Sequence, residues 1–305
     1  MSGPETWSRR DFVKLAAAAG LLPELSLAEG KSMMTRKIPA SGEELPVIGL
    51  GTWQVVDVES TPEEVSLRKR IVDLLIDHGG SLLDTSPMYN RSERVIGDVL
   101  EAGSSRDQLF LATKVWTDGK ASGERQMQRS AELMNSRVID LMQVHNRRDL
   151  DTHLGTIREW QEQERIRYNG VTDYRESAHD DMEDVIERYK PEFIQINYSL
   201  GEHGADDRLL PVALDSGVAV LVNRPYMSGR LFRAVGKREV PEWARTFAAS
   251  WGQFFLKFIV SHPAVTAVIP ATSNVRHMAD NLAAGFGEMP DSATRARMIS
   301  FIESL

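Results

Sequence analysis

The chain has 305 residues, of which 42% are hydrophobic and 26% are charged, a composition typical of a globular protein. Its formal net charge is −8 and it contains no basic run, which argues against a nucleic-acid partner. Cysteine is absent, which excludes disulfides, a thiolate metal site and a cysteine nucleophile. A chain of this length can form one large α/β barrel or two domains of medium size.

The N-terminal segment differs in character from the rest of the chain. Arg9 and Arg10 precede a short apolar stretch of small residues, and Ser26 and Ala28 offer a small-x-small cleavage point. This layout is typical of a secretory signal, and the paired arginines resemble a bacterial twin-arginine signal. An amphipathic N-terminal helix is the alternative interpretation.

We therefore expect residues 1–30 to be a signal peptide and residues 31–305 to form the folded domain. The twin-arginine export machinery would then be a partner, and the mature protein would be periplasmic; without export it would be cytoplasmic. The apolar stretch is shorter than the roughly 20 residues that a membrane-spanning helix needs. No other segment is long and apolar enough to span, so we expect a soluble mature protein.

From residue 37 onward, strand-like and helix-like segments alternate. Apolar, strand-like segments lie at residues 45–53, 81–86, 109–116, 138–145, 168–173, 192–199, 218–223 and 266–271. Helical spacing of apolar residues predicts helices at residues 61–80, 93–103, 122–136, 153–166, 176–189, 206–216, 243–261, 274–285 and 291–304. At the first helix, Thr61 is the expected N-cap, Pro62 suits the first position, and Glu64 would complete a capping box.

Eight strand–helix units of this length predict one (β/α)8 TIM barrel, with an open doubly wound sheet as the alternative. Residues 37–46 precede the first barrel strand and are expected to form a small hairpin that caps the N-terminal end of the barrel. Residues 291–304 would be an extra C-terminal helix. The long segment at residues 224–242 is expected to cover the substrate or the cofactor pyrophosphate.

Polar residues stand at the ends of three consecutive predicted strands, where the chemistry of such a barrel is located. The second strand ends on Asp84, with Tyr89 in its loop; the third carries Lys114 and the fourth ends on His145. Each has a structural explanation taken alone, because Asp84 can form a turn, Tyr89 can pack on a helix, Lys114 can snorkel and His145 can lie in the core. Four such groups on one rim favour a catalytic site instead.

This set of residues has a chemical logic. Reduction of a carbonyl group by hydride needs a proton donor for the developing alkoxide, and a phenol has a pKa near 10. An adjacent Lys114 would lower the pKa of Tyr89 toward the working pH, and Asp84 would hold that lysine charged and oriented. His145 could donate to the carbonyl oxygen. No side chain supplies hydride, so the chemistry requires a nicotinamide cofactor.

In this order and on these strands, Asp84, Tyr89, Lys114 and His145 resemble the catalytic tetrad of the aldo-keto reductase superfamily. The resemblance extends along residues 37–305 and includes the segments "GLGTW" (49–53), "LLDTSPMYNRSERVIGDVL" (82–100), "VIDLMQVH" (138–145), "GVTDY" (170–174), "QINYSL" (195–200) and "IPATSNVRHMADNLAA" (269–284). It implies a bacterial NAD(P)H-dependent oxidoreductase that reduces an aldehyde or ketone to an alcohol, with Tyr89 as the proton donor.

The resemblance also implies which residues bind the cofactor. They are Gly51, Thr52, Thr172, Asp173, Gln195, Asn223, Thr272, Ser273, Asn274, Arg276, His277 and Asn281. Thr172, Asp173 and Gln195 would lie at the nicotinamide carboxamide. Thr272, Ser273 and Asn274 would lead into a helix that receives the phosphate of the adenosine ribose, and Asn281 would contact the adenine. This set favours NADPH over NADH.

The sequence departs from the family pattern at four of the cofactor positions. Asp173 replaces the usual asparagine, and Asn223 stands where many members stack an aromatic ring on the nicotinamide. Ala271 and His277 occupy positions that are often basic in strong NADP binders. The choice between the two cofactors therefore rests mainly on the helix start and on the neighbouring Arg276.

Two tryptophans and two alternative functions remain open at this point. Trp53 and Trp116 stand at strand ends, where they can wall an apolar substrate pocket or belong to the core. A cofactor-binding sensor or auxiliary subunit on the same fold is one alternative function. A lyase that uses Lys114 as a Schiff base is the other, although it gives no role to Tyr89.

Overall fold

The computed structural model describes residues 32–305, so the predicted signal peptide at residues 1–30 lies outside the described part of the chain. Eight parallel strands form one sheet in sequence order. They are β3 (Leu50–Gly51), β4 (Leu82–Asp84), β5 (Phe110–Val115), β6 (Ile139–His145), β7 (Ile166–Thr172), β8 (Phe193–Asn197), β9 (Ala219–Asn223) and β10 (Val265–Val268). An antiparallel hairpin of β1 (Thr35–Lys37) and β2 (Glu44–Pro46) precedes them.

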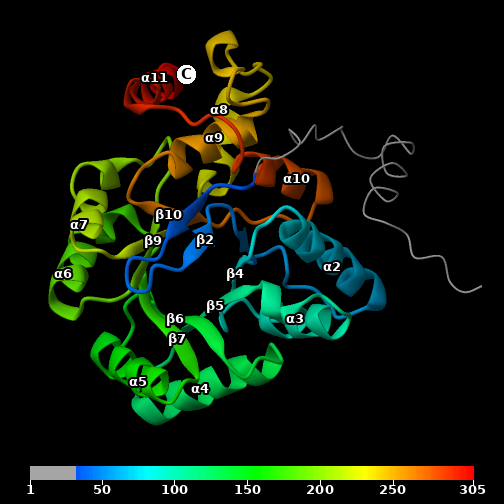
Figure 1. The fold of residues 1–305 in the computed structure, drawn as a ribbon, viewed down its shortest axis with the longest axis vertical. Coiled ribbons are helices and arrows are strands. Elements are labelled where there is room, and N and C mark those ends of the chain that lie inside the picture. Colours follow the sequence, from blue (N-terminus) through cyan, green and yellow to red (C-terminus); the bar gives the residue numbers. More distant parts are fainter. Residues whose placement is uncertain (1–31) are drawn as a thin grey trace, which may run out of the picture. The chain divides into compact units, whose positions relative to one another are not determined.

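Helices surround these strands on the outside (Figure 1). They are α2 (Pro62–Asp77), α3 (Ser92–Glu101), α4 (Lys120–Leu133), α5 (Leu150–Glu162), α6 (His179–Tyr189), α7 (Leu209–Asp215), α8 (Arg230–Val235), α9 (Trp251–Val260), α10 (Val275–Ala283) and α11 (Ser292–Glu303). The predicted (β/α)8 barrel, N-terminal hairpin and extra C-terminal helix are confirmed. Within residues 32–305, no helix is long and apolar enough to cross a membrane.

The first and last barrel strands meet and bring the sheet close to a full cylinder. The amide of Gly49 donates to the carbonyl of Val268 at 2.9 Å, and the amide of Val268 donates to the carbonyl of Val47 at 2.9 Å. At Gly51, a Cβ atom would lie 2.7 Å from the backbone oxygen of Ile269. Glycine is required there because any side chain would hold the two strands apart.

Several predicted boundaries differ from the structure for local reasons. The expected first strand is divided, since Glu44–Pro46 pairs in the hairpin and only Leu50–Gly51 forms β3. Thr61 does cap α2, but the carboxylate of Glu64 bonds to Arg68 one turn later instead of completing the capping box. The helix expected at 243–261 begins at Trp251.

The late start of α9 follows from its cap. The side chain of Ser250 accepts a hydrogen bond from the amide of Gln253 at 3.0 Å, which defines a new helix start. A separate short 3-10 turn, Glu242–Ala244, precedes it. The long segment at residues 224–242 also contains the short helix α8.

The hydrophobic core has two layers because alternate residues of each strand point to opposite faces. One layer lies between the sheet and the helices. The other fills the barrel interior and consists of Ile38, Leu45, Leu82, Phe110, Ala112, Leu141, Tyr168, Phe193, Ala219, Leu221, Ala267 and Ile269. The rings of Phe110, Tyr168 and Phe193 pack together there, with centroids 5.5 to 6.0 Å apart; Phe110 stacks on Tyr168, and Phe193 meets the other two at steeper angles. Ile38 and Leu45 come from the hairpin, which therefore closes the interior of the barrel at the N-terminal ends of the strands.

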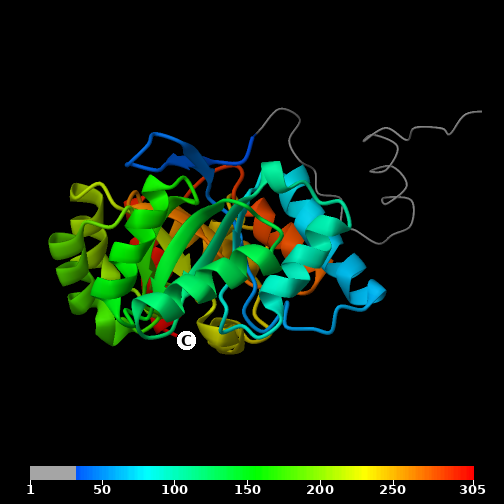
Figure 2. The same cartoon turned by 90° about the horizontal axis from the view of Figure 1, so that it is seen from below.

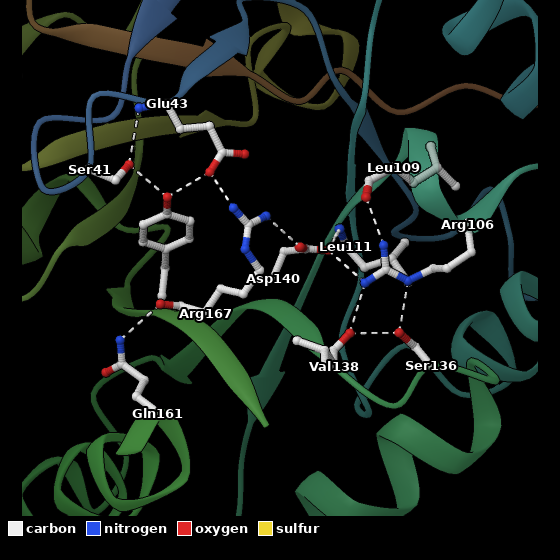
Figure 3. A network of polar contacts seen from close by, with 11 residues as sticks. Ser41, Glu43, Arg106, Leu109, Leu111, Ser136, Val138, Asp140, Gln161 and Arg167 are labelled. Carbon is white, nitrogen blue, oxygen red and sulfur yellow. Dashed lines mark hydrogen bonds and ion pairs between the residues drawn. The ribbon is translucent and has the colours of Figure 1, made fainter. Parts of the chain in front are cut away.

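A polar network fixes the hairpin to the N-terminal end of the barrel (Figure 3). The hydroxyl oxygen of Tyr168 lies 2.7 Å from both Ser41 Oγ and Glu43 Oε2, so it can donate to the carboxylate and accept from the serine hydroxyl. Arg167 bonds to Glu43 and, at 2.8 Å, to Asp140. Figure 2 shows the hairpin (blue) across one end of the barrel and the α8 segment (yellow) at the opposite end.

Asp140 is the centre of this network. It is 4% exposed and accepts three hydrogen bonds at 2.8 Å, from the guanidinium groups of Arg106 and Arg167 and from the amide of Leu111. Arg106 also reaches Ser136 and two backbone carbonyls, so it joins the N-terminal ends of β5 and β6. One buried carboxylate therefore ties three barrel strands and the hairpin together.

We expect Asp140→Ala to lower the free energy of unfolding by about 3 kcal/mol, because it leaves a buried amide without its acceptor and removes one charged acceptor from each of two guanidinium groups. Urea denaturation followed by circular dichroism measures this loss. Glu159→Gln is the matched control, since it removes an ion pair with Lys120 in which both side chains are half exposed, and it should cost less than about 1 kcal/mol. Equal losses in the two variants would contradict the central role of Asp140.

Candidate active site

The four residues that the sequence predicts as a tetrad meet at the C-terminal ends of three adjacent strands. Asp84 is the last residue of β4, Lys114 is the fifth of six residues in β5, and His145 is the last residue of β6. Tyr89 lies in the loop after β4. Because parallel strands place their C-terminal ends on one rim, side chains far apart in sequence become neighbours there.

Lys114 and Asp84 form an ion pair inside the barrel. Lys114 Nζ lies 2.6 Å from Asp84 Oδ2 and 2.7 Å from the carbonyl oxygen of Thr85, and the lysine is 0% exposed. Burial alone would lower the pKa of Lys114, but attraction to Asp84 and Tyr89 outweighs it, so that this pKa lies above its usual value. The lysine is therefore charged at neutral pH.

The second oxygen of Asp84 is held by two glutamines. Asp84 Oδ1 accepts hydrogen bonds from Gln195 Nε2 at 2.9 Å and from Gln143 Nε2 at 3.1 Å. The amide of Gln195 also donates to Gln143 Oε1 at 3.1 Å. The carboxylate is thus bonded on both oxygens, which offsets the cost of keeping a charge in the barrel interior.

Tyr89 lies over the lysine, and its ring centroid is 5.2 Å from Lys114 Nζ. Burial raises the pKa of this phenol, Lys114 opposes the rise, and Asp84 adds to it; the pKa ends above its ordinary value. The expectation that Lys114 brings this pKa down toward neutrality is therefore wrong for the structure as it stands, because desolvation outweighs the ammonium. Tyr89 is protonated at neutral pH, the form that can donate a proton.

His145 completes the group and is uncharged. Its ring meets the ring of Tyr89 edge-on, with centroids 6.0 Å apart, and its Nδ1 lies 3.0 Å from Ser86 Oγ. Burial, followed by repulsion from Lys114, lowers the pKa of His145 to about 3, although Asp173 acts in the opposite direction. A neutral imidazole carries one N–H, so it can donate one hydrogen bond to a substrate oxygen.

Two of the residues assigned to the nicotinamide carboxamide, Thr172 and Gln195, converge with Asn223 beside this group. Gln195 Oε1 accepts long hydrogen bonds of 3.4 Å from Thr172 Oγ1 and from Asn223 Nδ2. Asn223 Oδ1 is buried and has no partner within residues 32–305. A buried acceptor without a donor is costly, and a carboxamide N–H group would satisfy it.

Asp173 is adjacent but already engaged. It is 1% exposed, and both of its oxygens accept from Arg175 at 2.7 to 3.1 Å, while Arg147 donates at 3.2 Å. Burial favours protonation, but the hydrogen bonds from Arg175 hold the pKa of Asp173 below its usual value. The aspartate that replaces the usual asparagine is thus bonded to two arginines. Their hydrogen bonds use the oxygens that could otherwise bond to a cofactor.

The residues assigned to the adenosine end lie together around the start of α10. Asn274 is the N-cap, and its Oδ1 accepts from the amides of Arg276 and His277 at 2.8 and 3.3 Å. Thr272 Oγ1 accepts from the amide of Asn274 at 3.0 Å. Ser273, Arg276 and His277 are exposed. Since the protein itself uses these backbone amides, a phosphate at this helix start would depend on the exposed side chains.

Asn281 and the first strand complete the set of assigned residues. Asn281 lies on α10, is 4% exposed and accepts a 2.6 Å hydrogen bond from Tyr226 in the segment after β9. This bond uses the amide oxygen and leaves its N–H groups for a ligand. Gly51 lies at the strand closure described above. The side chain of Thr52 is fully buried and, with Thr272, lines a small apolar cavity behind the sheet.

The two tryptophans have different environments. Trp53 is 49% exposed, which excludes a role in the core. Trp116 is half buried and faces the guanidinium of Arg148, whose central carbon lies 4.8 Å from the ring centroid. Both follow strands that carry the candidate site, so they remain candidates for an apolar wall.

Sequence reasoning missed four polar residues of this site. Gln143 precedes His145 by two positions, and the two-residue period of a strand was a signal that it shares the same face. Ser86 follows Asp84 by two positions. Arg147 lies in the left-handed region, with φ of 57°, so its direction was not predictable from strand alternation. Arg175 had no signal other than its position near Asp173.

The structure has a (β/α)8 barrel with a buried Lys–Asp pair, a protonated tyrosine and a neutral histidine on its C-terminal rim. This is the arrangement expected of the aldo-keto reductase class, and the comparison with protein families agrees with it. Residues 47–296 match the model of the Aldo/keto reductase family, and the chain belongs to this family.

Individual relatives show how far the similarity extends. The aldo-keto reductase YhdN of Bacillus subtilis (strain 168) is 28% identical over 211 residues, which cover 64% of this chain but only 62% of that relative. The NADH-specific methylglyoxal reductase of Escherichia coli (strain K12) is 26% identical, with 69% and 73% of the two chains covered. An aldo-keto reductase of Klebsiella pneumoniae in complex with NADPH superposes with a TM-score of 0.74 at 24% identity, covering 88% and 96%.

Proposed function

We propose that this protein reduces an aldehyde or ketone to an alcohol at the C-terminal rim of the barrel, with Tyr89 as the proton donor. The observation that carries the proposal is the phenol of Tyr89 over the buried pair of Lys114 and Asp84, beside the neutral His145. A nicotinamide cofactor supplies the hydride when bound. Family membership supports the reaction class.

Each of these side chains has a separate part in the proposed reaction. Tyr89 is protonated at neutral pH and gives its proton to the carbonyl oxygen as negative charge develops there. Lys114 stabilises the phenolate that remains, and Asp84 keeps the ammonium charged and in place. His145 donates a hydrogen bond to the same oxygen. A Schiff-base role for Lys114 is disfavoured, because that chemistry needs a neutral amine.

The polar groups of this chain fit a nicotinamide cofactor. The unpartnered Oδ1 of Asn223 and the weakly bonded Oε1 of Gln195 offer acceptors for the carboxamide, with Thr172 beside them. Asp173 would act indirectly, by holding Arg147 and Arg175 at the edge of the site. Asn281 keeps two N–H donors for the adenine.

NADPH is the proposed cofactor in preference to NADH. Arg276, His277 and Ser273 are exposed on the first turn of α10 and next to it, where they can bond to a 2′-phosphate. Similar proteins are associated with either cofactor: the Klebsiella structure holds NADPH, and the Escherichia relative is described as NADH-specific. That relative is also named for methylglyoxal, which makes small 2-oxoaldehydes the first substrates to assay.

Replacing Tyr89 with phenylalanine keeps the ring and removes only the hydroxyl. Reduction of methylglyoxal or another accepted carbonyl should fall by roughly 10²-fold or more, the usual scale for losing a positioned acid. The dissociation constant for NADPH, measured by quenching of tryptophan fluorescence, should barely change. Tyr189→Phe on α6 is the matched control and should retain full activity. Full activity in a folded Tyr89→Phe protein would contradict the role of Tyr89 as proton donor, whereas an unaltered protein that binds NADPH but reduces no carbonyl would favour the sensor or auxiliary-subunit alternative.

The cofactor preference is tested with the double variant Arg276→Ala and His277→Ala. It should weaken NADPH binding roughly 10-fold, equivalent to about 1.4 kcal/mol, and leave NADH binding nearly unchanged. Titration calorimetry with both cofactors measures this. Arg125→Ala on α4 removes one exposed positive charge elsewhere and should affect neither. Equal affinity of the unaltered protein for the two cofactors would contradict the assignment of the phosphate site.

Export through the twin-arginine route is proposed from Arg9 and Arg10 and from the cleavage point near Ala28. We expect the mature protein in the periplasm of a bacterial host that carries this machinery, with an N-terminus near residue 29 by mass spectrometry. Replacing both arginines with lysine retains the charge and should leave the full-length chain in the cytoplasm. A full-length, cytoplasmic product of the unaltered gene would end this proposal.

A further inference from the structure

His145 has a side-chain partner that the proposed reaction has not yet used. Its Nδ1 atom lies 3.0 Å from the hydroxyl oxygen of Ser86, which belongs to the loop after β4 and is 0% exposed. The opposite ring nitrogen, Nε2, makes no hydrogen bond within residues 32–305 and is not among their buried, unpartnered atoms. One side of the imidazole is therefore held by the protein, while the other is available to a substrate.

The direction of the hydrogen bond between Ser86 and His145 follows from the other contact of this hydroxyl. The backbone amide of Met88, which can only donate, lies 3.3 Å from Ser86 Oγ and occupies one of its lone pairs. The hydroxyl proton must then find an acceptor, and within the described part of the chain His145 Nδ1 is the acceptor in reach. If Nδ1 carried a proton instead, the hydroxyl proton would be buried without a partner, at a cost of about 1 to 3 kcal/mol.

The position of the single imidazole proton matters because His145 is neutral. Burial and the charge of Lys114 keep its pKa at about 3 despite the opposing charge of Asp173, and the other titratable group that faces it is Tyr89. A proton on Nε2 makes the free edge of the ring a donor. A proton on Nδ1 would turn a lone pair toward the same space and repel a carbonyl oxygen.

We propose that Ser86 is a positioning residue that holds His145 in the tautomer with its proton on Nε2, so that the imidazole donates to the substrate oxygen. The inference rests on the proposed function for its catalytic consequence, but the tautomer itself exists without substrate. Ser86 stands two residues after Asp84, so the strand end that carries the buried carboxylate leads directly to the residue that contacts the histidine.

The test compares Ser86→Ala with Ser86→Thr, which keeps a hydroxyl, and with Ser92→Ala. Ser92 is the matched control because its hydroxyl is also fully buried, in the helix after the same loop, but has no partner within residues 32–305. Nitrogen-15 NMR of the cofactor-free protein near pH 7 reports which ring nitrogen carries the proton. The His145 signals are assigned by their absence in His145→Gln.

We expect the unaltered protein, Ser86→Thr and Ser92→Ala to show protonated Nε2 and bare Nδ1. Ser86→Ala should show a mixture of tautomers, a kcat lower by roughly 10-fold, as expected for losing one oriented hydrogen bond, and an unchanged NADPH dissociation constant. A proton on Nδ1 in the unaltered protein, or an unchanged tautomer and kcat in Ser86→Ala, would overturn the inference. If no carbonyl is reduced by the unaltered protein, the proposed function fails, while the NMR result still decides the tautomer.

Discussion

The ion pair between Lys114 and Asp84 constrains everything else at the rim of this barrel. Two charges inside a protein are tolerated only when they meet each other and satisfy their remaining hydrogen-bonding capacity. Here Asp84 receives Lys114 on one oxygen and two glutamines on the other, and the lysine also bonds to a backbone carbonyl. The pair favours the observed register of β4 and β5, because a one-residue slip would turn a charge toward the apolar layer. Lys114 also acts to lower the pKa of both Tyr89 and His145, next to the larger effect of burial.

The two ends of the barrel use polar side chains in opposite ways. At the N-terminal end, Glu43, Arg167, Asp140 and Arg106 bond to one another and hold the hairpin against the barrel floor. At the C-terminal end, some bonding capacity is left unused, as at Asn223 Oδ1. Satisfied networks contribute stability, whereas unsatisfied groups on a rigid frame can bind a ligand. The division agrees with a barrel that is stabilised at one end and carries its chemistry at the other.

The residues around the proposed nicotinamide site show how the aspartate at position 173, in place of the usual asparagine, changes its surroundings. A carboxylate at position 173 attracts cations that an amide would not, and Arg147 and Arg175 occupy it from two directions. The amide of Asn223 then provides an acceptor in the same region, at a position where other family members stack a ring. At the adenosine end, Asn274 caps its own helix, so that selectivity between the two cofactors depends on exposed side chains.

The sequence by itself determined the barrel, its hairpin and extra helix, and the strand ends that carry Asp84, Lys114 and His145. These depend on local periodicity, on caps such as Thr61 and on the rule that parallel strands end on one rim. It did not determine the partners across the rim, such as Ser86 for His145, which lies 59 positions away. It also gave the wrong direction for the pKa of Tyr89. Only the tertiary structure decided these points, because distance and burial in three dimensions set both hydrogen bonding and desolvation.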